Sequence, residues 1–142
     1  MKYLLLITLF CISLFGANVD TFAKEAGYER DFQTALQKAK KANKPLMMVL
    51  GADYCPWCRK FERKTLESKA VKNFIKDETI ALVVDKKFDI ESFPKAFQTS
   101  ITPRVFFIDP ATQKSFYQTA GYIKKKEYLK KLKEMKTQFK AK

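Results

Sequence analysis

Two cysteines separated by two residues are the part of this sequence best suited to chemistry. Cys55 and Cys58 stand in the stretch GADYCPWCRKF, between an apolar run and a helical pattern. A pair with this spacing has three uses: a structural disulfide, half of a metal site, or a redox couple that changes state during function. The residues around the pair favour the third use.

A purely structural disulfide at this spacing would contribute little to stability. Chain-entropy theory relates the stabilisation to the number of residues in the closed loop, and a four-residue loop gives only about 2 kcal/mol. We therefore regard a structural role as the weakest explanation for the spacing of Cys55 and Cys58 within one helical turn.

A metal site would need more ligands than the two thiolates. Zinc takes four, and the sequence has neither a histidine nor a second cysteine pair. A two-coordinate Cu(I) site at the two sulfurs stays open as an alternative, with Met47 or Met48 as a soft further ligand. Those methionines lie in an apolar run that is typical of a core strand. The missing histidine also excludes catalysis by Ser/His and Cys/His pairs.

The redox use agrees with the local pattern. If Cys55 occupies the first turn of the helix that follows the apolar run, unpaired backbone amides and the helix dipole stabilise its thiolate. Pro56 then falls where its missing N–H has no effect. Cys58 lies one turn further on the same side, where it can attack a mixed disulfide formed at Cys55. We therefore predict Cys55 as the nucleophile and Cys58 as the resolving cysteine.

Apolar periodicity and turn residues predict the elements that position this pair. In chain order they are a helix within 29–43, a buried strand at 45–52, a helical pattern over 56–75 broken near Ser68, a buried strand at 79–85, a short helix at 92–99, strands at 104–109 and 115–120 joined by a turn, and a helix at 125–140. Ser92 is expected to cap the short helix, with Pro94 in its first turn. The last helix is expected to face the core with the following residues: Tyr128, Leu129, Leu132, Met135 and Phe139.

These elements predict the α/β class, with a mixed sheet of about four or five strands and helices on both faces. Two strands joined through a helix run parallel, and a closing hairpin adds antiparallel strands. With 142 residues, 46% of them hydrophobic, and no internal repeat, the chain has room for one core. We expect a single domain over residues 18–142.

The first 17 residues are typical of a secretory signal peptide. Lys2 precedes an apolar run over 3–15, and small residues follow at Gly16 and Ala17. The run is shorter than the roughly 20 residues that span a bilayer. We therefore expect cleavage and export to the periplasm or cell envelope, with an uncleaved membrane tether or a buried N-terminal helix as alternatives. Cys11 would leave with the peptide.

The chain is strongly basic, with 28 Lys and Arg residues against 15 Asp and Glu and a net charge of +13. Lysines interleave with apolar residues over 124–136, which is typical of a solvated helix face. Because export also argues against nucleic acid, we expect no nucleic-acid partner. An acidic protein partner or an anionic membrane surface stays as an alternative.

From about residue 28 to residue 136 the sequence resembles the thioredoxin superfamily, and especially the thioredoxin-like reductase domains of the bacterial envelope. Three stretches carry the resemblance: NKPLMMVLGADYCPWCRKFERKTL, SITPRVFFID and AGYIKKKEYLKKL. It implies a thioredoxin-like fold with a cis-proline loop facing the cysteines. It also implies a groove for an extended polypeptide, flanked by these residues: Cys55, Trp57, Thr102 and Pro103. Support for the helix start and its loop is expected from Pro56, Tyr54 and Asp53.

One position departs from this family. Thioredoxin and many relatives carry a buried acid six residues before the first cysteine, where it takes the proton from the resolving thiol. Here that position is Val49. Asp53 is nearer in sequence but is expected at the loop surface. Resolution by Cys58 would then depend on water or on a group of the substrate.

The resemblance implies a thiol:disulfide oxidoreductase whose redox group is the Cys55–Cys58 disulfide, with no bound cofactor and no metal. We expect a monomeric reductase of protein disulfides or of a partner redox protein, reset by a membrane redox partner. The alternatives are a disulfide oxidase or isomerase, a non-enzymatic Cu(I) carrier, and a binding module with a vestigial cysteine pair.

Overall fold

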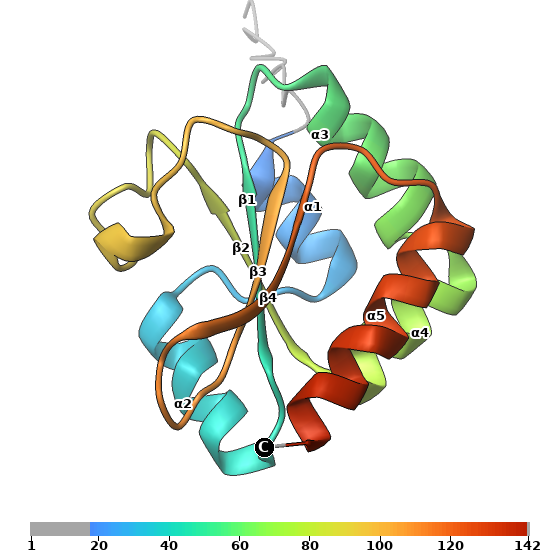
Figure 1. The fold of residues 1–142 in the computed structure, drawn as a ribbon. Coiled ribbons are helices and arrows are strands. Elements are labelled where there is room, and N and C mark those ends of the chain that lie inside the picture. The colour runs from blue at the N-terminus through green and yellow to red at the C-terminus, as the bar shows by residue number, and fades with distance from the viewer. Residues whose placement is uncertain (1–17, 142) are drawn as a thin grey trace, which may run out of the picture.

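The computed structural model describes residues 18–141 and contains a four-stranded mixed sheet in the order β2-β1-β3-β4 (Figure 1). Its strands are β1 (Leu46–Gly51), β2 (Ile80–Asp85), β3 (Arg104–Ile108) and β4 (Ser115–Ala120). β1 and β2 are parallel, whereas β3 is antiparallel to both β1 and β4. The predicted fold class is therefore confirmed. The predicted signal peptide lies outside the described residues.

Helices precede, separate and follow these strands. They are α1 (Val19–Ala26), α2 (Phe32–Ala42), α3 (Pro56–Phe61), α4 (Lys69–Glu78) and α5 (Lys125–Lys140), with the π-helix η1 (Glu62–Leu66) and the 3₁₀ helix η2 (Lys95–Phe97). The bounds of α5 are those predicted, and the break near Ser68 falls between η1 and α4. Over residues 18–141, no helix has both the length and the apolar character needed to cross a membrane.

Two buried clusters cover the two faces of the sheet. Side chains alternate along β1, so Met47 and Val49 join one cluster, whereas Leu46, Met48 and Leu50 join the other. The first cluster contains α1, α3, η1, α4 and α5, and the second contains α2 and η2. Figure 1 shows α3, α4 and α5 on one side of the strands and α2 on the other.

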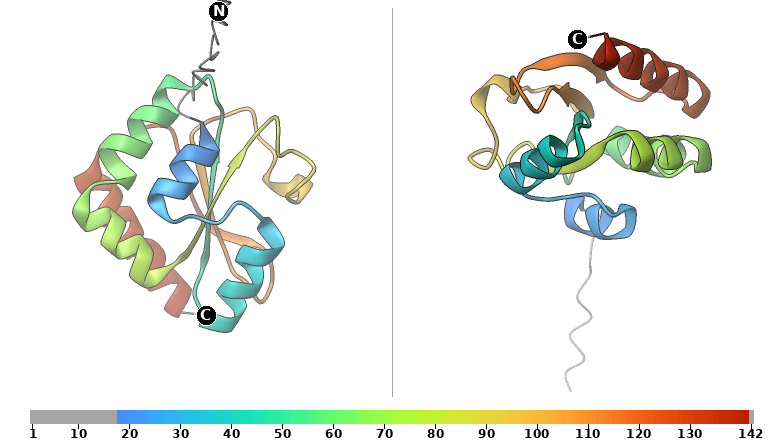
Figure 2. Two further views of the ribbon diagram at one scale, coloured as in Figure 1. Left: turned by 180° about the vertical axis from the view of Figure 1, so that it is seen from behind. Right: turned by 90° about the horizontal axis from the view of Figure 1, so that it is seen from below.

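Helix α1 has no counterpart in the predicted elements. Its signals are present in the sequence, because the Asn18 side chain accepts a hydrogen bond from the N–H of Thr21 at 3.0 Å and Gly27 ends the helix at φ +73°. It buries Phe22 in the first cluster, and the left view of Figure 2 shows it in front of the sheet. Glu29, just beyond it, forms an isolated parallel bridge with Leu82 of β2.

The short helix predicted over 92–99 is only partly correct. The helix is confined to the 3₁₀ turn Lys95–Phe97, with Pro94 before its first residue. Ser92 does not cap it, because its hydroxyl donates to the carbonyl of Asp89 at 2.7 Å. Burial of Phe93 and Phe97 holds this loop against the sheet. A longer helix was predicted here, but the packing of two rings holds the segment in place instead.

The inward face predicted for α5 is largely correct. Tyr128, Leu132 and Met135 are buried, whereas Leu129 and Phe139 are half-buried. Tyr128 meets the ring of Phe61 edge-on, with 5.0 Å between the ring centroids. Phe61 belongs to α3, so the closing helix packs directly beneath the helix that carries the cysteines.

Candidate active site

The cysteine pair lies where β1 gives way to α3. Cys55 is the N-cap residue of α3 and forms a disulfide with Cys58, with 5.1 Å between the two Cα atoms. The N–H of Cys58 donates to the sulfur of Cys55 at 3.1 Å. A sulfur that accepts an amide hydrogen bond at a helix start is well placed to carry negative charge once reduced.

The two sulfurs differ in access. Cys55 keeps 9% of its surface exposed, whereas Cys58 keeps 1%. A partner can therefore approach only the sulfur of Cys55. This asymmetry agrees with the roles predicted from the sequence, in which Cys55 reacts first and Cys58 reacts within the protein.

Pro56 and Trp57 follow Cys55 at the start of α3. Pro56 occupies a first-turn position, as predicted. The ring of Trp57 is 57% exposed and packs against Tyr122, with 5.9 Å between the ring centroids. The ammonium of Lys60 lies over both rings, 5.0 Å from the centroid of Trp57 and 4.7 Å from that of Tyr122.

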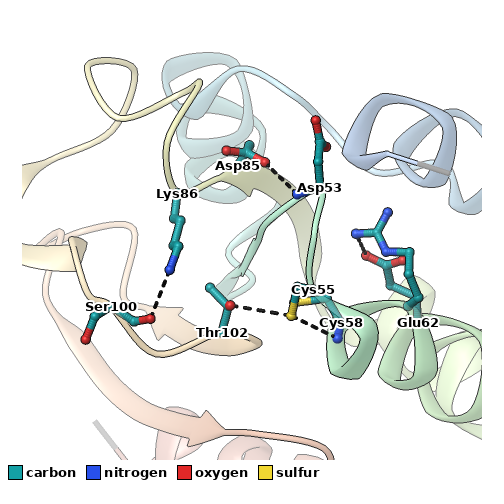
Figure 3. Close-up of a disulfide and its surroundings, with 9 residues drawn as sticks. Asp53, Cys55, Cys58, Glu62, Asp85, Lys86, Ser100 and Thr102 are labelled. Atoms are coloured by element: carbon teal, nitrogen blue, oxygen red, sulfur yellow. Dashed lines mark hydrogen bonds and ion pairs between the residues drawn. A yellow bond between two sulfur atoms is a disulfide. The ribbon is translucent and has the colours of Figure 1, made fainter. Parts of the chain in front are cut away.

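The loop before β3 brings Thr102 and Pro103 to the cysteines. The hydroxyl of Thr102 donates to the sulfur of Cys55 at 3.5 Å (Figure 3), and the Thr102–Pro103 peptide bond is cis. The carbonyl of Pro103 accepts from the N–H of Gly121 at 2.8 Å. Residues predicted from two distant stretches of sequence therefore meet at one sulfur.

The support predicted for Tyr54 is not seen, because its side chain is 97% exposed. The carboxylate of Asp85 holds this region instead. It accepts the backbone N–H groups of Asp53 at 3.1 Å, Lys87 at 2.8 Å and Phe88 at 2.9 Å. Asp85 is itself buried at the end of β2. Asp85 ends the apolar run TIALVVD, and an acid at that position is the sequence feature that could have indicated this role.

A second missed residue is Glu62, which lies on the other side of the disulfide from Thr102 (Figure 3). Only 5% of its surface is exposed, and its carboxylate pairs with the guanidinium of Arg59 at 2.8 Å. Burial raises the pKa of Glu62 to about 7, although the charge of Arg59 acts in the opposite direction. A buried carboxyl with such a pKa exchanges its proton near neutral pH.

Gly51 lies beside both this ion pair and the resolving cysteine. A Cβ at Gly51 would lie 3.9 Å from Nη2 of Arg59 and 4.0 Å from the sulfur of Cys58. The guanidinium and the sulfur thus border the same small space at the end of β1. Val49, where the family places its acid, is buried in the first cluster. Position 49 therefore carries no acid, but the ion pair of Arg59 on α3 with Glu62 of η1 lies close to the resolving cysteine.

The methionines considered as soft ligands are fully buried in the sheet, Met47 in one cluster and Met48 in the other. Both lie in the first half of β1, whereas the cysteines follow its Gly51 end. Within residues 18–141, no group of three or more His, Cys, Asp or Glu side chains is arranged to hold a metal ion.

Solved structures with the same fold are thioredoxins and related oxidoreductases. A thioredoxin from Thermus thermophilus has a TM-score of 0.67 at 17% identity, covering 76% of this chain and 85% of its own. The structure titled DsbH Oxidoreductase has a TM-score of 0.62 at 18% identity, covering 80% and 85%. The C-terminal domain of DsbD from Neisseria meningitidis in the reduced form has 0.60 at 20%, covering 72% and 91%.

Curated relatives share shorter regions. An uncharacterized protein of Caenorhabditis elegans is 34% identical over 67 residues, which are 46% of this chain and 9% of that protein. Anterior gradient protein 2 homolog of Homo sapiens is 26% identical over 84 residues, 59% of this chain and 46% of that protein. The chain thus spans less than half the length of these relatives.

A sequence profile of the thioredoxin-like domain matches residues 32–136, which include the cysteine pair, the cis-proline loop and most of α5. The match covers most of the chain and coincides with the fold and with the disulfide at the start of α3. This chain therefore belongs to the thioredoxin-like family, and it carries the C-x-x-C pair of a thiol:disulfide oxidoreductase.

Proposed function

We propose that this protein is an exported, monomeric disulfide reductase that acts on protein disulfides or on a partner redox domain. The observation that carries the proposal is the asymmetry of the pair, in which Cys55 keeps 9% of its surface exposed beside Thr102 and Cys58 keeps only 1%. Structures named DsbH Oxidoreductase and DsbD share the fold, and the DsbD domain was solved in both reduced and oxidised forms. Those titles support a redox cycle at the cysteine pair.

The reaction begins with the reduced pair. The Cys55 thiolate attacks one sulfur of the substrate disulfide, which forms a mixed disulfide and releases the other substrate sulfur as a thiolate that takes up a proton. The Cys58 thiolate then attacks the sulfur of Cys55 and releases the second substrate thiolate, which is protonated in turn. The substrate gains two electrons and two protons, and the protein is left with the Cys55–Cys58 disulfide. A dithiol partner at the membrane restores the reduced pair by the reverse exchange.

The second step requires the thiol of Cys58 to lose its proton inside the protein. Water reaches this side poorly, because Cys58 is 1% exposed. Glu62 follows Cys58 by four residues, on the same side of the helix, and its raised pKa suits it to accept a proton near neutral pH. We assign Glu62 this role in place of the acid that the family carries at the position of Val49.

The same exchange chemistry run in the opposite direction would make the protein an oxidase, so the reduction potential tests the proposal. Thioredoxin has a potential of about −270 mV and the strong periplasmic oxidase about −120 mV, a separation of about 7 kcal/mol. Equilibration with glutathione buffers, read by alkylation and mass spectrometry, is expected to place the pair nearer the first value. A potential nearer the second would overturn the reductase assignment.

The export part of the proposal depends on residues 1–17. Mass spectrometry of the protein from an envelope fraction is expected to show a mature chain that begins close to Asn18, which would keep the capping residue of α1. Recovery of the full-length chain from the membrane fraction would identify the segment as a tether. Recovery of the full-length chain in the cytosol would contradict export.

A further inference from the structure

The large apolar side chains that remain exposed are gathered at one end of the molecule. Over the described residues they are Tyr54, Trp57, Phe88, Ile90 and Ile101. All of them belong to the cysteine stretch, to the loop after β2, or to the loop before β3. Isolated apolar side chains are common on protein surfaces, but a group confined to the loops around a reactive sulfur marks a contact surface.

These residues lie on two sides of Cys55. Trp57 packs on Tyr122, beyond the end of β4, so it lies toward the β4 edge of the sheet. Phe88 follows β2, which forms the opposite edge. Between β1 and the loop after β2 is a depression of about 360 Å³, which we call the lateral pocket, and its lining includes Tyr54, Cys55, Lys86, Lys87, Phe88 and Thr102.

The lateral pocket is apolar within and positive at its rim. The ring of Phe88 is 69% exposed, and the ammonium of Lys87 lies 5.7 Å from its centroid. Lys86 reaches across to the carbonyl of Ser100, to which it donates at 3.1 Å (Figure 3). Within residues 18–141, no carboxylate lies within ion-pair distance of either lysine. Their charges are therefore available to a partner.

The lining carries two acids, Asp53 and Asp85, beside the two lysines, so the positive character of the rim depends on where these charges lie. Asp85 is buried, and its carboxylate is occupied by three backbone N–H groups of the surrounding loops. Asp53 is the remaining acid of the lining, against the two ammonium groups of Lys86 and Lys87. A carboxylate on a bound polypeptide would be attracted to this rim, and an ammonium would be repelled.

We propose that the lateral pocket binds the substrate residues next to the reactive cysteine, and that it selects an apolar side chain with an acidic neighbour. The inference rests on the proposed function, because the sulfur of Cys55 forms part of the pocket wall. It adds a specificity surface on the β2 side of the sulfur to the groove at Trp57, Thr102 and Pro103. The apolar side chain packs between Tyr54 and Phe88, and the acidic one meets Lys87.

The test compares peptide disulfides that differ only beside the reactive cysteine: Glu-Leu, Lys-Leu or Glu-Ser. Bis(2-hydroxyethyl) disulfide, a small neutral molecule, reports the reactivity of Cys55 without docking. We expect kcat/KM of the wild-type protein for the Glu-Leu peptide to exceed that for each of the other two peptides by about tenfold, mainly through KM. All rates are expressed relative to the small disulfide.

Variants assign the two preferences to their residues. Lys87→Glu is expected to reverse the preference for Glu-Leu over Lys-Leu, and Phe88→Ser to remove the preference for Glu-Leu over Glu-Ser. The control Lys40→Gln/Lys41→Gln removes two charges from the last turn of α2, distant from the pocket. It is expected to retain both preferences.

Equal rates for the three peptides, with the small disulfide still reduced, would overturn the pocket while leaving the reductase intact. So would preferences that persist in both pocket variants. No reduction of the small disulfide by the wild-type protein would overturn the proposed function itself. Since Phe88 is largely exposed and Lys87 makes no ion pair, neither substitution threatens folding.

Discussion

The two sulfurs of one disulfide face two different parts of the molecule. Cys55 faces loops, with the hydroxyl of Thr102 at 3.5 Å and exposed aromatic rings and lysines around it. Cys58 faces the interior, where the ion pair of Arg59 with Glu62 borders the end of β1. The difference fits the two proposed tasks, in which one side admits a partner and the other accepts a proton.

Removal of either sulfur is expected to have the largest effect on activity. Cys55→Ser is expected to abolish reduction of insulin disulfides, because the buried Cys58 cannot reach a substrate. Cys58→Ser is expected to keep the first attack and to accumulate mixed disulfides, which non-reducing gels and mass spectrometry detect. Wild-type rates in both variants would refute the enzymatic role, and tight Cu(I) binding without exchange would favour a carrier.

Two phenylalanines test whether the buried region and the exposed loops contribute differently to stability. Phe22 of α1 is buried in the first cluster, so Phe22→Ala is expected to lower the free energy of unfolding by about 3 kcal/mol. Phe88 lies on the open side, and Phe88→Ala is expected to change it by less than about 0.5 kcal/mol. Urea unfolding measures both values. Equal losses would show that the loop side is not the open surface described above.

Asp85 joins the loops on the open side. Asp85→Ala leaves backbone N–H groups of three loop residues without an acceptor, so it is expected to cost about 2 kcal/mol of stability and to raise KM for peptide disulfides. Asp85→Asn keeps a side-chain oxygen and should lose less. Urea unfolding and peptide kinetics provide the two readouts, and an unchanged KM in the Ala variant would separate this carboxylate from substrate binding.

The pH dependence of the resolution rate tests the role proposed for Glu62 on the buried side. With its pKa raised to about 7, Glu62 accepts a proton only above that pH, so the resolution rate is expected to rise through this region. Glu62→Gln is expected to remove that rise and to slow resolution about tenfold at alkaline pH, measured by quenched-flow trapping of the mixed disulfide. Glu67→Gln is the matched control, because Glu67 is a more exposed glutamate of the same region that pairs with Lys72. An identical pH profile in the two variants would exclude the assigned role.

The same carboxyl affects stability, and its direction is opposite to that of most surface acids. The folded protein binds the proton of Glu62 more tightly than the unfolded chain does, since the ordinary pKa is 4.5. The free energy of unfolding therefore falls as pH rises from 4.5 to about 7. Glu62→Gln should flatten this dependence in urea titrations.

The sequence was most informative where one physical signal dominated. The apolar run of β1 and the periodicity of α5 each predicted their elements, and the C-x-x-C pattern with Pro56 predicted the helix start. Helix α1 was missed because its short pattern follows the predicted leader directly, although Asn18 and Gly27 mark its ends. The loop after β2 was assigned too much helix, because its fold depends on Asp85 and on buried rings rather than on periodicity.

Glu62 could not be predicted for a related reason. A glutamate among Arg and Lys residues in a helical pattern indicates a solvated face, but the fold buries Glu62 at the start of η1. Val49 showed that the usual acid was missing, but the sequence did not indicate which residue lies near the resolving sulfur. The nucleophile Cys55 could be predicted from the local sequence, whereas the proposed proton acceptor of Cys58 depends on tertiary structure.

The bridge between Glu29 and Leu82 affects how this sheet can meet another polypeptide. The N–H of Glu29 donates to Ala81 at 2.8 Å, and its carbonyl accepts from Val83 at 3.0 Å, so the middle of the β2 edge already has its hydrogen bonds. A foreign chain cannot add along that edge as a full extra strand. Strand addition, including self-association into longer sheets, is blocked there by one residue of the protein's own backbone.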